Sequence, residues 1–295
     1  MTANYYDFME IGKLIKGDAE YPTRLHKLRN PPKQLYIAGQ SLTKLLQRPA
    51  VAIVGSRTMT AYGRQVTHDF ARALAEQGIV IVSGLALGVD AAAHRAALEV
   101  GGATIAVVPR SLDDIYPASH LGLSQMIVKR DGAIISEYPK GTTAYKSNFV
   151  ARNRIVAGLA DVILITEAAA GSGSLHTARF ARSAARPVLV VPGPINSPRS
   201  AGANDLLRRG ALAALHPDDV LRVLGIRKRR AVIHRLRGRN REEQAVLTLL
   251  ASGVYATEEL LARSILPVTV FNKTMSMLEI DGKVQMSGPG EWGLT

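Results

Sequence analysis

The chain has 295 residues, of which 47% are hydrophobic, enough to bury one α/β core and a smaller second module. Lysine and arginine number 37 against 24 aspartate and glutamate, which gives a formal net charge of +13. This charge favours a polyanionic partner, because neutralised phosphates release counterions, although a basic surface that only aids solubility would also produce it. The chain has no cysteine, which excludes disulfides, zinc–thiolate sites and thiol nucleophiles.

The amino terminus and the hydropathy of the chain indicate a cytoplasmic protein. The first ten residues, MTANYYDFME, include acidic side chains and no apolar run, which is unlike a signal peptide. No stretch approaches the roughly 18 consecutive apolar residues that a membrane-spanning helix requires. We therefore expect a cytoplasmic location with no membrane contact.

From Ala50 onward, short apolar runs alternate with longer helical patterns. This order is typical of parallel strands joined by helical crossovers, which is the α/β fold class. The runs are almost wholly apolar, as expected for strands that are buried on both faces of a parallel sheet. The predicted strands are residues 51–54, 79–82, 104–108, 133–136, 162–165 and 188–191.

The segments between the predicted strands have helical periodicity. In residues 62–77, Val66, Phe70 and Leu74 recur every four residues, and Gly78 follows as a stop signal. This helix is therefore expected to pack one apolar stripe against the sheet. Further helices are predicted over residues 90–100, 119–130, 153–160 and 175–185.

The composition divides the chain into four parts. Residues 226–241 contain eight basic residues and no acidic ones, so we expect a charged linker there. Three helical patterns and the start of a hairpin follow, which suggest a small winged-helix-like module, although a generic three-helix bundle fits nearly as well. The parts are an N-terminal extension packed on the main domain (1–44), the main domain (45–225), the linker (226–241) and the C-terminal module (242–295).

Two glycine- and serine-rich segments follow predicted strands and precede predicted helices. Gly55, Ser56 and Arg57 come after the first strand of the main domain, where free amides, a hydroxyl and a guanidinium can hold a phosphate. A second segment after residues 162–165 has the same character and consists of Gly171, Ser172, Gly173 and Ser174. A structural turn with an exposed arginine, and a plain serine cap, explain the same residues without a ligand.

A cation-rich segment with one aromatic residue lies between these two in the sequence. A single strand of nucleic acid suits such a segment, because a base stacks on the ring while the cations follow the phosphates. Alternatively, the phenylalanine anchors the segment and the arginines are solvated. We interpret the segment as a loop, and its candidate binding residues are Lys146, Phe149, Arg152, Asn153 and Arg154.

Motifs of common enzymes are absent from the sequence. Asp90 and His94 are four residues apart and could form an acid–base pair, but a helix cap and a packed histidine are favoured. No GxSxG elbow, GxGxxG dinucleotide fingerprint, P-loop or HExxH metal motif occurs. We therefore expect no catalytic residues, no metal and no cofactor.

The order and spacing of these motifs resemble the DNA-processing protein A family, also called DprA or Smf, over nearly the whole chain. Each motif alone is weak, whereas the ordered set is specific. The matching residues are Tyr21-Pro22, Gly55 to Arg57, Ser83 to His94, Glu137, Phe149, Arg152 to Leu159, Glu167-Ala168, Ser172 to Leu175, Thr177-Ala178, Pro192-Gly193, Gly202 and Asn204.

The resemblance implies an extended Rossmann-like parallel sheet with helices on both faces, whose strand-end pocket holds single-stranded DNA. Gly55, Ser56 and Arg57 would hold one phosphate and Lys146 another, Phe149 would contact a base, and the remaining pocket residues would be Asn153, Arg154 and 171–174. The family protects incoming single strands in natural transformation and loads RecA recombinase, so RecA is an expected partner. A homodimer through the Rossmann-like domain is similarly implied.

Two alternative functions remain open. Phosphoribohydrolases share this topology, but their PGGxGTxxE loop supplies a catalytic glutamate, and residues 170–179 of this chain contain no carboxylate. A transcription regulator would use the basic linker and the C-terminal module on duplex DNA. The preference for single strands or duplex discriminates between the mediator and the regulator.

Overall fold

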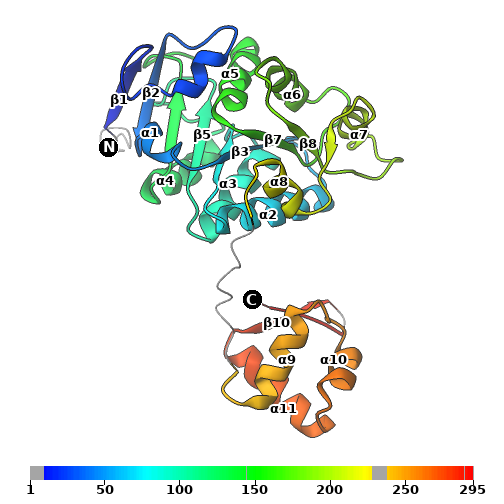
Figure 1. Cartoon of the computed structure of the whole chain (residues 1–295). Helices are drawn as coiled ribbons and strands as arrows, with labels where there is room; N and C mark the ends of the chain where they lie inside the picture. The colour runs from blue at the N-terminus through cyan, green and yellow to red at the C-terminus, as the bar shows by residue number, and fades with distance from the viewer. Residues whose placement is uncertain (1–9, 144, 228–237, 289, 295) are drawn as a thin grey trace. The chain divides into compact units, whose positions relative to one another are not determined.

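The computed structural model describes residues 10–143, 145–227, 238–288 and 290–294. The chain divides into two units, Met1–Lys228 and Arg229–Thr295 (Figure 1). Most of the predicted linker, residues 228–237, lies outside the described residues. Within the described ranges, no helix is both long and apolar enough to cross a membrane.

The large unit is built on one nine-stranded sheet, counted over its described residues, in the order β1-β2-β6-β5-β4-β3-β7-β8-β9. The strands from β6 to β9 in this order are parallel, and β1 and β2 are antiparallel additions at one edge. All six predicted strands are present. The strands are β1 Ile11–Ile15, β2 Gln34–Gly39, β3 Ala50–Val54, β4 Val80–Ser83, β5 Thr104–Val108, β6 Ala133–Ser136, β7 Val162–Ile165, β8 Val188–Val190 and β9 Leu212–Ala213.

Helices cover both faces of this sheet, and alternate strand residues pack against different layers. In β3, Ala50, Ala52 and Val54 pack with one layer, and Val51 and Ile53 pack with the other. The first layer contains α1 Leu42–Leu45, α5 Lys146–Leu159, α6 Ser174–Ser183 and α7 Ala201–Arg208. The second contains α2 Ala61–Glu76, α3 Val89–Glu99, α4 Leu121–Lys129 and α8 Pro217–Val223 (Figure 1). The Rossmann-like prediction with helices on both faces is confirmed.

The N-terminal segment contributes to the sheet, beyond the packed extension that its sequence suggests. β2 pairs antiparallel with β6, and β1 pairs with β2. A short 3-10 helix, η2 Thr23–Lys27, buries Leu25 against Gly158 of α5, where an added Cβ would come within 2.9 Å of the leucine. β1 is mostly exposed, which explains why its residues lack the apolar run that marks the central strands.

The small unit contains three helices followed by a hairpin, the order that the sequence predicts. Its elements are α9 Arg241–Ala251, α10 Thr257–Ser264, α11 Val268–Ile280, β10 Val284–Gly288 and β11 Glu291–Leu294. Val246, Leu250, Phe271 and Leu278 form a core of their own. Arrangement as a winged helix stays a prediction.

Candidate nucleic-acid interface

The carboxyl ends of β3 and β7 form the switch point of the parallel sheet. These two strands are neighbours, but the chain leaves β3 into α2 on one face and leaves β7 into α6 on the other. Loops that diverge in this way leave a crevice outside the strand ends, which is where open α/β sheets bind ligands. Both predicted glycine- and serine-rich segments lie at this crevice.

A pocket of about 890 Å³ occupies the switch point. The structure brings eleven of the twelve predicted site residues to its wall, and Arg154 is the exception. The lining includes Gly55, Ser56, Arg57, Lys146, Phe149, Arg152, Asn153, Gly171, Ser172, Gly173 and Ser174, together with Arg110, Tyr116 and His176.

Arg57 and Phe149 contact each other across the pocket although they are far apart in the sequence. The Arg57 guanidinium carbon lies 4.8 Å from the centroid of the Phe149 ring, which is a cation–π contact. Tyr116 meets the same ring edge to face, with centroids 5.8 Å apart. Arg57 is exposed and Phe149 is half-buried, so a cation and an aromatic platform face the solvent together.

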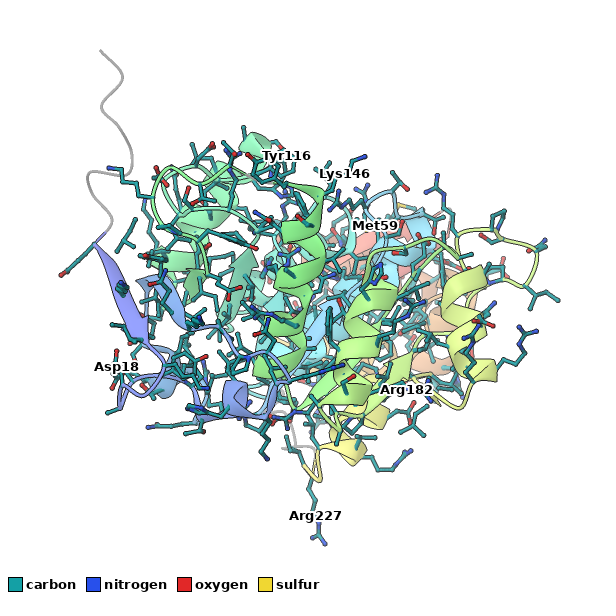
Figure 2. The ribbon with its side chains drawn as sticks, turned by 90° about the horizontal axis from the view of Figure 1, so that it is seen from above. Asp18, Met59, Tyr116, Lys146, Arg182 and Arg227 are labelled. Atoms are coloured by element: carbon teal, nitrogen blue, oxygen red, sulfur yellow. The ribbon has the colours of Figure 1, made fainter. Side chains whose placement is uncertain are left out.

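Lys146 lies at the first residue of α5, so the cation-rich segment is a helix and the interpretation as a loop is wrong. The helix begins without a side-chain cap and with no acidic residue in its first turn. A lysine at this end is unfavourable, because the helix dipole is already positive there. A local conflict of this kind is typical of a functional site, and an anion would relieve it. Figure 2 shows Lys146 and Tyr116 near each other at the start of α5.

The loop between β7 and α6 presents a second uncapped helix end to the pocket. Gly173 is the N-cap residue of α6, with no side-chain hydrogen bond to the first amides. The amides of Gly171 and Gly173 have no hydrogen-bond partner among the described residues. The Ser172 and Ser174 hydroxyls lie 2.8 Å apart. This loop can therefore offer backbone amides and hydroxyls to an anion.

The β3–α2 loop offers less free backbone than the sequence suggests. The Ser56 amide donates to the Glu167 carbonyl over 2.8 Å, and the buried Ser56 hydroxyl accepts from the Thr58 amide over 3.2 Å. Gly55 allows close packing here, because an added Cβ would lie 2.6 Å from the Glu167 carbonyl oxygen. Arg57 is thus the group of this loop that is most available to a ligand.

Arg152 reaches the pocket wall but is committed to the interior. The residue is 4% exposed, and its guanidinium donates to the carbonyls of Gly84 and Val107 and to the Asn153 side chain. Burial lowers the Arg152 pKa to about 10, and the Asp90 carboxylate opposes this shift. Arg152 therefore holds the floor of the pocket and adds positive charge from below.

Arg154 corrects the sequence interpretation, because it does not line the pocket. Its guanidinium is buried, with 10% of the side chain exposed, and forms hydrogen bonds of 2.6 and 2.7 Å to both Glu137 carboxylate oxygens. Helical geometry explains the outcome, since residues two apart point to different sides of α5. Arg154 fixes α5 to the end of β6.

Asp90 and His94 do not form an acid–base pair. The Asp90 carboxylate accepts hydrogen bonds from the Gly84 and Ala86 amides at 3.1 and 3.4 Å, and burial raises its pKa. Gly88, not Asp90, is the N-cap of α3. His94 is fully buried and bonds to the Thr104 hydroxyl over 2.6 Å, so the packed-histidine reading holds.

Four further side chains near the pocket were not predicted. Arg110, Tyr116 and His176 line it directly, and Arg199 donates to the carbonyl and hydroxyl of Thr58 at its edge. Arg110 follows β5 at the same sheet edge, so its position after a strand could have identified it. The other three lie in loops or on α6, where the sequence carries no comparable signal.

The fold and the pocket define a Rossmann-like α/β protein with a cationic, aromatic ligand site at the carboxyl edge of its sheet. Within the described ranges, no group of histidine or carboxylate side chains could hold a metal ion. The family model described as DNA recombination-mediator protein A matches residues 13–225. The chain belongs to this family.

Relatives from several bacteria support the assignment. The chain is 40% identical to the protein Smf of Escherichia coli over 70% of this chain and 55% of that protein. It is 40% identical to the DNA processing protein DprA of Streptococcus pneumoniae over 68% of this chain and 70% of that protein. The chain spans about half the length of the E. coli and Mycobacterium tuberculosis relatives that it matches.

Solved structures of the family have the same fold. The DNA processing protein A of Helicobacter pylori, solved to describe its single-stranded DNA binding mode, has 40% sequence identity and a TM-score of 0.66, covering 74% of this chain and 96% of that one. The S. pneumoniae protein has 38% identity and a TM-score of 0.68, covering 72% and 74%.

Proposed function

We propose that this chain is a single-stranded DNA-binding recombination mediator. It would protect incoming single strands in natural transformation and load RecA on them, in the cytoplasm and as a homodimer through the Rossmann-like domain. The carrying observation is the meeting of Arg57, Lys146 and Phe149 at one pocket. RecA loading, transformation and dimerisation rest on the family alone.

The pocket chemistry favours a single strand over a duplex. A base must leave its stack to lie on the Phe149 ring, and in a single strand it is already free to do so. Arg57 and Lys146 then neutralise neighbouring phosphates without reading the sequence. The single-stranded DNA binding mode described for the H. pylori relative agrees with this proposal.

We further propose that the protein has no catalytic activity of its own. Among the described residues that line the pocket, Asp90 is the sole carboxylate. Two backbone amides already occupy it, so it is poorly placed to act on a substrate. The loop from Ala170 to Arg179 offers no acid in its place.

The test is a titration of the full chain with single-stranded and duplex oligonucleotides of equal length at several salt concentrations. The proposal predicts tighter binding of single strands, with log affinity falling by about 0.7 per neutralised phosphate against log salt. A preference for duplex, or an affinity independent of salt, contradicts it. A RecA assay on protein-coated single strands then tests loading, where no acceleration by the chain would remove that part of the proposal.

A further inference from the structure

A second cationic groove lies between α6 and α7, outside the pocket described above. It consists of two adjoining cavities of about 190 Å³ each, and it is called the α6–α7 groove below. The two cavities share Ala178, Arg182, Leu206 and Arg209. Figure 2 shows Arg182 on α6, well apart from Lys146 and Tyr116.

The α6–α7 groove has an excess of positive charge. Four arginines line it against a single carboxylate, that of Asp205. Arg209 already pairs with Asp205 over 2.7 Å, and hydrogen bonding from Arg208 lowers the pKa of that carboxyl. Arg179 and Arg182 are exposed and have no acidic partner in the described part of the chain. Their cationic groups are therefore available to an external anion.

Arg179 and Arg182 belong to the same face of one helix. They are three residues apart, which places them as neighbours on the surface of α6. Ser174, at the start of this helix, lines the large pocket. Arg182 is eight residues further, a distance of about 12 Å along the helix axis. The helix thus carries polar groups from the pocket into the groove.

The ridge between the pocket and the groove is low. Gly171 and Gly173 line the pocket, and Ala170 and Leu175, which alternate with them along the chain, line the groove. A Cβ added at either glycine would meet nothing within 4 Å, so the space above this backbone is open. A chain of phosphates could cross here without displacing a side chain.

We infer that the α6–α7 groove binds the continuing phosphate backbone of a single strand whose bases lie in the pocket. This inference rests on the proposed function. Arg179 and Arg182 would contact phosphates beyond those held by Arg57 and Lys146. The groove supplies charge without an exposed aromatic ring, so it would add affinity and length dependence but no base contact.

An acidic protein surface is a different occupant that the charge alone would allow. The observations favour the strand, because the groove continues from the pocket over an open glycine ridge along a single helix. A separate protein partner would require no such continuity. The length of the bound strand distinguishes the two occupants.

The experiment compares the full chain with the variant Arg179→Ala/Arg182→Ala on oligothymidines of about 4 and about 16 nucleotides, the range of common single-strand sites. The matched control is Arg95→Ala/Arg130→Ala, which removes two exposed arginines from the opposite helical layer. We expect the groove variant to bind the long oligomer ~10-fold more weakly, with a salt slope lower by about 1.4 for two phosphates. Short-oligomer affinity should change less than about twofold.

The outcomes separate the two proposals. If the parent protein fails to bind either oligomer, the proposed function is wrong and this inference falls with it. If the parent binds both, but the groove variant matches the control on the long oligomer, the strand does not follow the groove and only this inference is overturned. Restored long-oligomer affinity in Arg179→Lys/Arg182→Lys would support recognition through charge.

Discussion

Arginines at the pocket fall into two groups that differ in burial and in partners. Arg57 is exposed and touches only the Phe149 ring, whereas Arg152 and Arg154 are buried and hydrogen-bonded inside the protein. Taking a guanidinium out of water is costly unless its donors are satisfied, so the buried pair must serve the fold. The exposed arginine retains its donors for a ligand. One residue type therefore builds the pocket and also equips it.

The largest effect on stability should come from Arg154→Ala. Removal of this guanidinium leaves the Glu137 carboxylate without its partner at the end of β6. We expect the free energy of unfolding to fall by about 3 kcal/mol, as for other broken buried pairs. Denaturant unfolding measures this loss. Arg57→Ala is the matched control and should change stability by less than about 0.5 kcal/mol. Equal losses in both variants would remove the distinction between the groups.

The buried histidine beneath the pocket should make stability depend on pH. Burial, followed by the charges of His120, Arg152 and Arg95, lowers the pKa of His94 to about 3 from an ordinary value of 6.5. The folded state therefore resists protonation, and its stability is complete above about pH 6.5 and falls as the pH decreases toward 3. The expected loss is about 1.4 kcal/mol per pH unit. Unfolding at pH 7, 6 and 5 should show this slope in the parent and lack it in His94→Gln; an equal slope in both would contradict it.

Arg57→Ala should weaken single-strand binding most among the exposed positions. Charge-assisted contacts to a phosphate contribute about 1.5–3 kcal/mol where water is partly excluded. Fluorescence titration with a short oligothymidine measures the loss. Arg72→Ala, which removes another exposed arginine further along α2, should retain parent affinity. The assignment of Arg57 fails if the two variants bind alike.

Phe149→Ala should reduce affinity by about 1–3 kcal/mol without a change in salt dependence. Base stacking releases no counterion, so the slope of log affinity against log salt should match the parent. Phe149→Trp retains an aromatic face and should preserve most of the binding. A reduced slope in Phe149→Ala would mean that the ring acts by positioning cations, Arg57 above all.

Lys146→Ala should have the smallest effect, because a lysine ammonium is a strongly hydrated point charge. We expect a weakening of no more than about 1 kcal/mol. The salt slope should fall by about 0.7, which corresponds to one phosphate. Titrations over a range of salt concentrations measure both quantities, and an unchanged slope would place Lys146 away from the strand.

The sequence predicts the centre of the fold better than its edges. Central strands such as β3 and β7 are buried on both faces, so their residues form apolar runs that periodicity detects. β1 is exposed and β9 has two residues, so neither produces such a run. The strand ends also identify most of the pocket, because parallel strands bring their carboxyl ends to one edge.

The side chains of α5 show where sequence reasoning ends. A loop at residues 146–154 would have allowed all of its cations to face the pocket. The segment is helical, and helical spacing turns Arg154 toward Glu137 while Phe149 faces Arg57. Tyr116 reaches the same ring from a distant loop. Contacts of this kind depend on tertiary packing, which local sequence patterns do not encode.

The most direct test of the account is single-strand binding by the variant Arg57→Ala/Lys146→Ala/Phe149→Ala at physiological salt. All three side chains are at least partly exposed, so the free energy of unfolding should remain close to that of the parent. The account predicts affinity for a short oligothymidine at least ~100-fold below the parent value, because the separate losses exceed about 3 kcal/mol together. A folded triple variant that binds as tightly as the parent would contradict the assignment of the site to this pocket.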